Sequence, residues 1–188
     1  ITSGDYILRG CTPIVCTTPS DTAGYTITSG SEQLDLSQGD FSVSVSCASG
    51  YQGTAAAAPC TTSGDYTLSG CSQCQAGTAG IDGTCNNCGP GTYQPSEGQF
   101  SCLECTGQGE YQDELSSIVC KTCGDGTEPN TERTACVNCP INSAGTSGSC
   151  LPCEAGKYQP LEGQTTCDHI YCDENEYVSN NSCQPCPL

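Results

Sequence analysis

The chain has 188 residues, among them 20 Cys, 23 Gly and 11 Pro, and it contains no Trp, no Met and only two Phe. Burying one large apolar side chain contributes about 1.5–3 kcal/mol, so such a small number of large apolar side chains cannot offset the conformational entropy that is lost on folding. Disulfide bonds must supply the difference, and such a cysteine content is typical of disulfide scaffolds in oxidising compartments. The composition therefore predicts an extracellular protein, either secreted or at a cell surface.

The formal net charge is −17, and the only basic residues are Arg9, Lys121, Arg133 and Lys157. Nucleic acid and anionic membrane surfaces both need a Lys/Arg footprint, so the charge excludes both as partners. No apolar run approaches the ~18–20 residues of a membrane span, so we expect no direct membrane insertion by this segment.

The first part of the chain contains a long repeat. The opening SGDYILRGC (3–11) recurs as SGDYTLSGC (63–71), so we interpret residues 1–15 as the tail of a preceding unit and 16–71 as a complete one. FSVSVSC (41–47) alternates apolar and polar residues, and 25–28 and 66–68 are short β-prone runs. TAAAAP (54–59) is too short to nucleate a helix and ends at a proline. These patterns predict a small antiparallel β-module.

Four cysteines of this unit carry a family resemblance. Cys47-Ala-Ser-Gly-Tyr, with Cys16 before it and Cys60 and Cys71 after it, resembles a sushi module, although Tyr66 stands where that family usually has Trp. The resemblance implies a sushi-like variant with crossed disulfides, Cys16–Cys60 and Cys47–Cys71.

From Cys71 onward the chain is punctuated by C-x2-C pairs, with a looser pair at 167/172. The spacing restarts at Cys136, which predicts one cysteine-rich superrepeat at 72–135 and a truncated second one at 136–188. CGPGTYQPSEGQFSC (88–102) and CEAGKYQPLEGQTTC (153–167) occupy the same place in the two superrepeats. A loop that occurs twice is more typical of a structural element than of a unique ligand site.

Most of these loops open with Gly near an aromatic residue, as in Gly91-Thr92-Tyr93. This resembles the ephrin-receptor-like cysteine-rich repeats found in tandem in protist and algal surface proteins, and more distantly the modules of tumour-necrosis-factor receptors. The resemblance implies an elongated rod of short loops with little regular secondary structure. The predicted fold class is therefore small and disulfide-rich, a sushi-like antiparallel β-module followed by such a rod. We expect the tyrosines to pack on the disulfides, namely Tyr51, Tyr66, Tyr93, Tyr111, Tyr158 and Tyr177.

Two disulfide patterns fit the spacing. If each loop closes on itself, Cys11 and Cys186 are left over at the broken ends of repeats, and the bonds are Cys74–Cys85, Cys88–Cys102, Cys105–Cys120, Cys123–Cys136, Cys139–Cys150, Cys153–Cys167 and Cys172–Cys183. The alternative is an interlocked pattern that begins Cys71–Cys85 and Cys74–Cys88. We prefer the loop-closing pattern because it explains both leftovers, although sequence alone does not determine connectivity.

Candidate chemistry is sparse. The cysteines at 71–88 have zinc-ribbon spacing, but an oxidising compartment disfavours thiolates, and a redox thiol needs positive charge. His169, the only histidine, is expected in an exposed loop, so we predict no enzyme and no cofactor. Acidic clusters at Asp113-Glu114 and at 173–176 lack a calcium-loop pattern and permit only weak Ca²⁺ association. Asn180 begins the sequon Asn-Asn-Ser and is predicted to be glycosylated.

These expectations favour a structural role. The segment is predicted to belong to a large repeat protein that forms an extracellular filament or coat, such as a mastigoneme on a flagellar surface. Its expected partners are copies of itself, other coat proteins and glycans. The alternative is the ligand-binding ectodomain of a receptor or adhesin, although a binder should concentrate hot-spot residues in one module.

Overall fold

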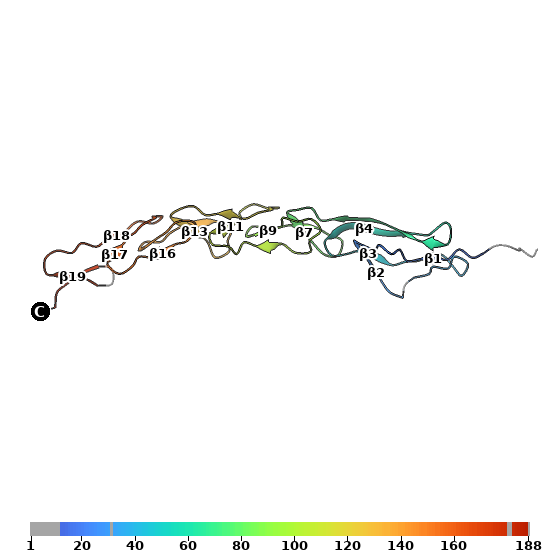
Figure 1. Cartoon of the computed structure of the whole chain (residues 1–188), viewed down its shortest axis with the longest axis horizontal. Helices are drawn as coiled ribbons and strands as arrows, with labels where there is room; N and C mark the ends of the chain where they lie inside the picture. Colours follow the sequence, from blue (N-terminus) through green and yellow to red (C-terminus); the bar gives the residue numbers. More distant parts are fainter. Residues whose placement is uncertain (1–11, 31, 180–181, 188) are drawn as a thin grey trace, which may run out of the picture. The chain divides into compact units, whose positions relative to one another are not determined.

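The computed structural model describes residues 12–30, 32–179 and 182–187 (Figure 1). Within these ranges all regular secondary structure is β-strand, arranged in short pairs that are antiparallel except for one. With nine disulfides and no helix among the described residues, the predicted small, disulfide-rich fold class is confirmed. In this part of the chain, no helix has the length and apolar character that crossing a membrane requires.

The chain forms two compact units. Unit 1 comprises residues 1–74, 80–85 and 98–100, and unit 2 comprises 75–79, 86–97 and 101–188. The rod predicted from the sequence stays a prediction.

Unit 1 contains three strand pairs around a small core. Its strands are β1 (Cys16–Thr17), β2 (Tyr25–Ile27), β3 (Val45–Cys47), β4 (Tyr51–Ala58), β5 (Gly64–Asp65) and β6 (Thr67–Gln73). β2 pairs with β3 and β4 with β6, both antiparallel, whereas β1 and β5 are parallel. The core is the Cys16–Cys60 disulfide against Tyr66, surrounded by half-buried aliphatic side chains and by Phe41, whose ring meets that of Tyr66 edge-on at 5.6 Å.

The alternation predicted at 41–47 is present in the burial of the side chains. Phe41, Val43 and Val45 are half-buried and Cys47 is buried, whereas the serines between them are exposed. Regular strand pairing is limited to 45–47, while Ser42 forms a single bridge to Gln33.

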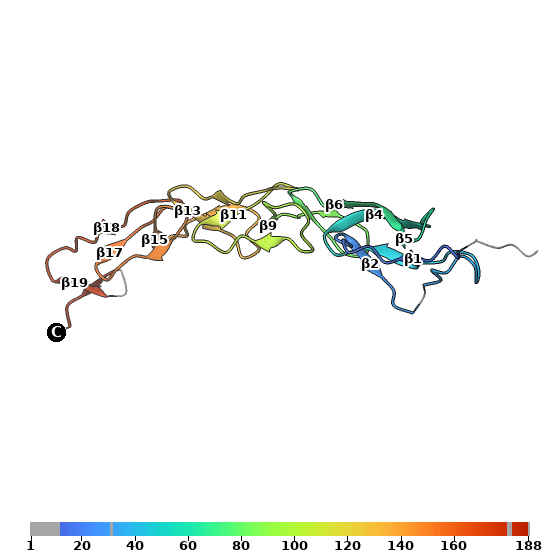
Figure 2. The ribbon, with the colours of Figure 1, turned by 45° about the vertical axis from the view of Figure 1, so that its right-hand side comes forward.

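β4 is the longest strand and includes the alanine run at 55–58, which the sequence did not identify as a strand. Alanine does not favour strands by itself, so the pairing of β4 with β6 determines this extended conformation (Figure 2). The pairing contains a bulge between Gly53 and Ala56. Gly53 and Gly70 have positive φ there, and a Cβ on either would lie 2.0 Å from a carbonyl oxygen of the opposite strand.

Unit 2 repeats one hairpin along its length. Each pair joins residues near the start of a disulfide loop to residues around or just after its closing cysteine. The pairs are β7 (Thr78–Ala79) with β8 (Asn86–Asn87), β9 (Thr92–Tyr93) with β10 (Leu103–Glu104), β11 (Glu110–Tyr111) with β12 (Lys121–Thr122), β13 (Thr127–Pro129) with β14 (Cys136–Asn138), β15 (Ser143–Ala144) with β16 (Leu151–Pro152), β17 (Lys157–Tyr158) with β18 (Asp168–His169), and β19 (Glu176–Ser179) with β20 (Ser182–Pro185).

Candidate functional site: the repeated disulfide loop

The structure pairs the cysteines loop by loop. In the nine disulfides the Cα atoms lie 5.4–5.9 Å apart, and the bonds are Cys16–Cys60, Cys47–Cys71, Cys74–Cys85, Cys88–Cys102, Cys105–Cys120, Cys123–Cys136, Cys139–Cys150, Cys153–Cys167 and Cys172–Cys183. Cys186 is exposed and has no disulfide partner among the described residues. Cys11 and the predicted glycosylation site Asn180 lie outside those residues.

Every loop from Cys47 onward contains a left-handed residue just after its opening cysteine. Its φ lies between 60° and 85°, and the residues are Gly50, Gly77, Gly91, Gly109, Gly126, Asn142, Gly156 and Asn175. Glycine adopts this conformation without a steric penalty, and asparagine is among the few other residues that tolerate it. The sequence indicated the glycines but not the two asparagines that replace them.

The carbonyl of this left-handed residue makes the same hydrogen bond in each loop. It accepts the N–H that lies three residues after the closing cysteine, at 2.8–3.0 Å, and the donors are Cys74, Cys88, Cys105, Cys123, Cys139, Cys153, Ile170 and Cys186. In all but one case the donor is the second cysteine of a pair. Ile170 takes that place after Cys167, and the next cysteine is displaced to Cys172. The looser 167/172 pair thus contains two additional residues, while the hydrogen bond that recurs from loop to loop is kept.

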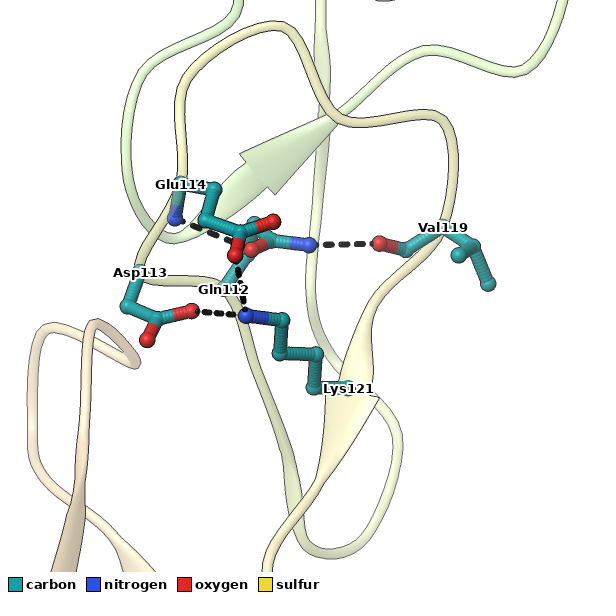
Figure 3. A network of polar contacts seen from close by, with 5 residues as sticks. All are labelled: Gln112, Asp113, Glu114, Val119 and Lys121. Carbon is teal, nitrogen blue, oxygen red and sulfur yellow. Dashed lines mark hydrogen bonds and ion pairs between the residues drawn. The ribbon is translucent and has the colours of Figure 1, made fainter.

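Buried glutamines fill the longer loops. Gln94, Gln112 and Gln159 are 2–5% exposed, and each follows the tyrosine near the loop opening. Each Nε2 donates to the carbonyl of the residue before the closing cysteine at 2.7–2.9 Å, and each Oε1 accepts the N–H two residues on at 3.0–3.1 Å. Figure 3 shows this for Gln112, which spans its loop to Val119. The side-chain amide therefore satisfies backbone groups across the loop.

Other loops fill this part of the loop differently, and loop length alone does not set the choice. The glutamine loops have cysteine separations of 14 or 15. The loop with a separation of 13 uses Asn130, whose side chain bonds Thr134 and Ala135 across the loop. Two loops with a separation of 11 have Gly80 or Gly145 there, where a Cβ would lie 1.8 Å from a carbonyl oxygen of the opposite side.

The tyrosines differ in burial from one loop to the next. Tyr66 is 1% exposed beside Cys16–Cys60, as expected for packing on a disulfide. Tyr93 and Tyr111 are half-buried, whereas Tyr158 and Tyr177 are 38% and 47% exposed. The sequence assigned the interior role to tyrosine, but in the loops of Tyr93, Tyr111 and Tyr158 the adjacent glutamine is the buried residue. The signal for it was the recurring Tyr-Gln dipeptide.

The acidic cluster Asp113-Glu114 is engaged by a lysine. Lys121 Nζ lies 2.7 Å from Asp113 and 2.9 Å from Glu114 (Figure 3). The hydrogen bond from Lys121 lowers the pKa of Asp113, and the two carboxylates raise the pKa of Lys121. Carboxylates that already share a cation are poorer ligands for Ca²⁺.

The second acidic cluster lies beside a disulfide. Glu176 lies within 4.8 Å of the sulfurs of Cys172 and Cys183, but these sulfurs are bonded to each other and cannot serve as thiolate ligands. Glu176 Oε2 instead accepts the backbone N–H of Asp173 at 3.3 Å.

Arg133 holds the turn of a neighbouring loop, a role that the sequence did not indicate. Its Nη1 donates to the carbonyls of Gly107 and Glu110 at 2.6 and 3.2 Å. Its own carbonyl accepts the N–H of Gln112 at 2.9 Å. Arg133 thereby connects loop 123–136 to loop 105–120.

Comparison with known proteins agrees with this architecture. Residues 79–110 match the family described as "Tyrosine-protein kinase ephrin type A/B receptor-like". Over 99 residues, 50% of the chain, the sequence is 33% identical to the rat protein "Sushi, von Willebrand factor type A, EGF and pentraxin domain-containing protein 1", and the mouse protein of that name matches equally. The chain spans only 2% of the length of these relatives. It is a cysteine-rich repeat-type extracellular segment with ephrin-receptor-like and sushi-like character.

Proposed function

We propose that this segment is structural and belongs to a large secreted or cell-surface repeat protein that builds an extracellular filament or coat, with a mastigoneme-like filament as the concrete candidate. The observation that carries the proposal is the hydrogen bond that recurs from loop to loop at 2.8–3.0 Å. It uses only backbone atoms, so it tolerates any residue except proline at the donor. Segments built this way extend by adding repeats, and each repeat contacts mainly its neighbours.

The proposal gives the segment no catalytic role. A general base has to be held beside the group that it deprotonates. His169 is exposed on β18, and its ring centroid lies 6.4 Å from that of Tyr171. The proposed partners are copies of the chain or other coat proteins, and the strongly negative charge argues against nucleic acid.

The test is assembly of the oxidised chain. Sedimentation velocity over a concentration series, with negative-stain electron microscopy of the same samples, should show regular assemblies with a constant lateral spacing. Chain that has been reduced and alkylated is the control and should not assemble, because its loops are open. A monomer at every concentration, with intact disulfides confirmed by mass spectrometry, contradicts the proposal.

A receptor or adhesin ectodomain is the second candidate, and exposed tyrosines near the end of unit 2 favour it. The architecture of the full-length gene separates the two. Many further tandem repeats without a membrane span support a filament, whereas a single span followed by a cytoplasmic signalling domain supports a receptor.

A further inference from the structure

One hollow of unit 2 departs from the repeat. It has a volume of about 340 Å³ and is lined by Tyr158, His169, Ile170, Tyr171 and Ser182, which come from β17, β18, β20 and the segment between β18 and Cys172. Ile170 and Tyr171 precede Cys172 in the 167/172 pair, the one pair with two additional residues. The irregularity in the cysteine spacing therefore supplies two walls of this hollow.

Three of the five residues that line the hollow carry aromatic rings, and those rings are exposed to solvent. Tyr171 is 89% exposed and Tyr158 38%, and the His169 and Tyr171 rings lie 6.4 Å apart with an interplanar angle of 54°. The backbone beneath them is ordered by the hydrogen bond from Ile170 N–H to Gly156 O at 2.9 Å. An exposed tyrosine face attracts cations because the ring carries negative charge on its faces.

The surrounding charge is negative. Asp168 on β18 and Asp173, Glu174 and Glu176 beyond it are all exposed. The cation on the adjoining strand, Lys157, is paired with Glu154 at 3.1 Å. These carboxylates repel a negatively charged partner and speed the encounter with a positively charged one.

We propose that this hollow, which we call the tyrosine hollow, binds a Lys/Arg-rich segment of another protein, with the cationic side chains against Tyr171 and Tyr158. A second copy of this chain is a poor occupant. Among the described residues, Lys121 and Lys157 are in ion pairs and Arg133 is bonded to backbone carbonyls. The inference does not depend on the assembly proposed above.

Binding of a fluorescent oligolysine peptide to the oxidised chain, measured by anisotropy at physiological ionic strength, tests the proposal. Any chain with a net charge of −17 attracts such a peptide, so the decisive variant is Tyr171→Ala, which leaves the charge unchanged. We expect it to weaken binding roughly three- to tenfold. Phe100→Ala is the matched control, since Phe100 is an exposed aromatic residue in unit 1 and should have no effect.

A second pair of variants tests the charge. Asp168→Asn should weaken binding more than Asp40→Asn, an equal charge change at an exposed position in unit 1. Unchanged thermal melting should confirm that Tyr171→Ala folds, as expected for an 89% exposed side chain. Equal affinity of wild type and Tyr171→Ala overturns the proposal. So does equal binding of an oligoserine peptide, or self-association that depends on Tyr171.

Discussion

Gln112 uses its side-chain amide twice within its own loop. Nε2 donates to Val119 O at 2.7 Å, and Oε1 accepts the N–H of Glu114 at 3.0 Å, while the side chain is 2% exposed. A methyl group in its place would leave the partly buried carbonyl of Val119 and N–H of Glu114 without these partners. Each such loss costs about 1–3 kcal/mol.

We therefore expect Gln112→Ala to lower the free energy of unfolding by about 2 kcal/mol or more, measured by guanidinium denaturation of the oxidised chain. The matched control is Gln108→Ala in the same loop, because Gln108 is exposed. Equal stability of the two variants would show that the buried amide bonds contribute nothing to stability.

Tyr66 gives unit 1 a specific response to high pH. The side chain is 1% exposed and its hydroxyl donates to Glu32 Oε1 at 3.2 Å. Burial, with a smaller effect of Glu32, raises the pKa of Tyr66, although a hydrogen bond with Thr18 opposes the change. In the unfolded chain tyrosine titrates near pH ~10.

The stabilisation linked to Tyr66 is therefore complete below about pH 10. It declines as the pH rises from there through the raised pKa of the folded state, because only the unfolded chain has lost the proton. Denaturation at a series of alkaline pH values should show this decline, and Tyr66→Phe should remove part of it. If the alkaline loss of stability is the same in Tyr66→Phe, another group causes it.

At the scale of the loop, substitutions at three glycines of unit 2 distinguish two causes of destabilisation, a left-handed backbone conformation and a steric clash of the added Cβ. Gly124 has no positive φ and no atom within 4 Å of an added Cβ. Gly156 has a φ of 85° but open space around it. Gly126 has a φ of 75°, and its Cβ would lie 2.2 Å from Gly163 O.

Alanine at these positions should destabilise in a fixed order. Gly124→Ala should be neutral or slightly stabilising, because it reduces the freedom of the unfolded chain. Gly156→Ala should cost about 1–2 kcal/mol from the left-handed backbone alone. Gly126→Ala should cost more, since a backbone carbonyl must also move. Denaturant midpoints of the three variants give the order, and a Gly156→Ala variant as stable as Gly124→Ala would contradict it.

The loops show how far the sequence could predict this structure. The cysteine content and the alternation at 41–47 were sufficient to predict the fold class. Both can be read from composition or from neighbouring residues, without knowledge of contacts between distant parts of the chain. The strand at 55–58 was missed because alanine has no local preference that indicates it. The role of Gln112 was missed because it depends on Val119 O lying across the loop, a contact set by the disulfide rather than by neighbouring residues.

For the whole molecule, charge pairing cannot be the source of order. The chain has 21 acidic and four basic residues, and the ion pairs among its described residues involve only Lys121 and Lys157. The remaining carboxylates repel one another, which favours solubility but disfavours compact states. Disulfides and the recurring backbone bonds must therefore stabilise unit 2, and each of them acts within one loop or between neighbouring loops.

Removing one disulfide should consequently have a local effect. In the double variant Cys105→Ala/Cys120→Ala, we expect amides within 105–120 to lose protection from hydrogen exchange. Two amides outside this loop should also lose protection, because the N–H of Gly91 donates to Gln112 O and the N–H of Gln94 donates to Ser117 O. Closing a loop of this size contributes about 3 kcal/mol. Protection within loop 172–183 should be unchanged, because a repeat array transmits disorder only through its neighbours. Hydrogen exchange with mass spectrometry measures both regions, and a uniform loss across unit 2 would instead indicate a single cooperative core.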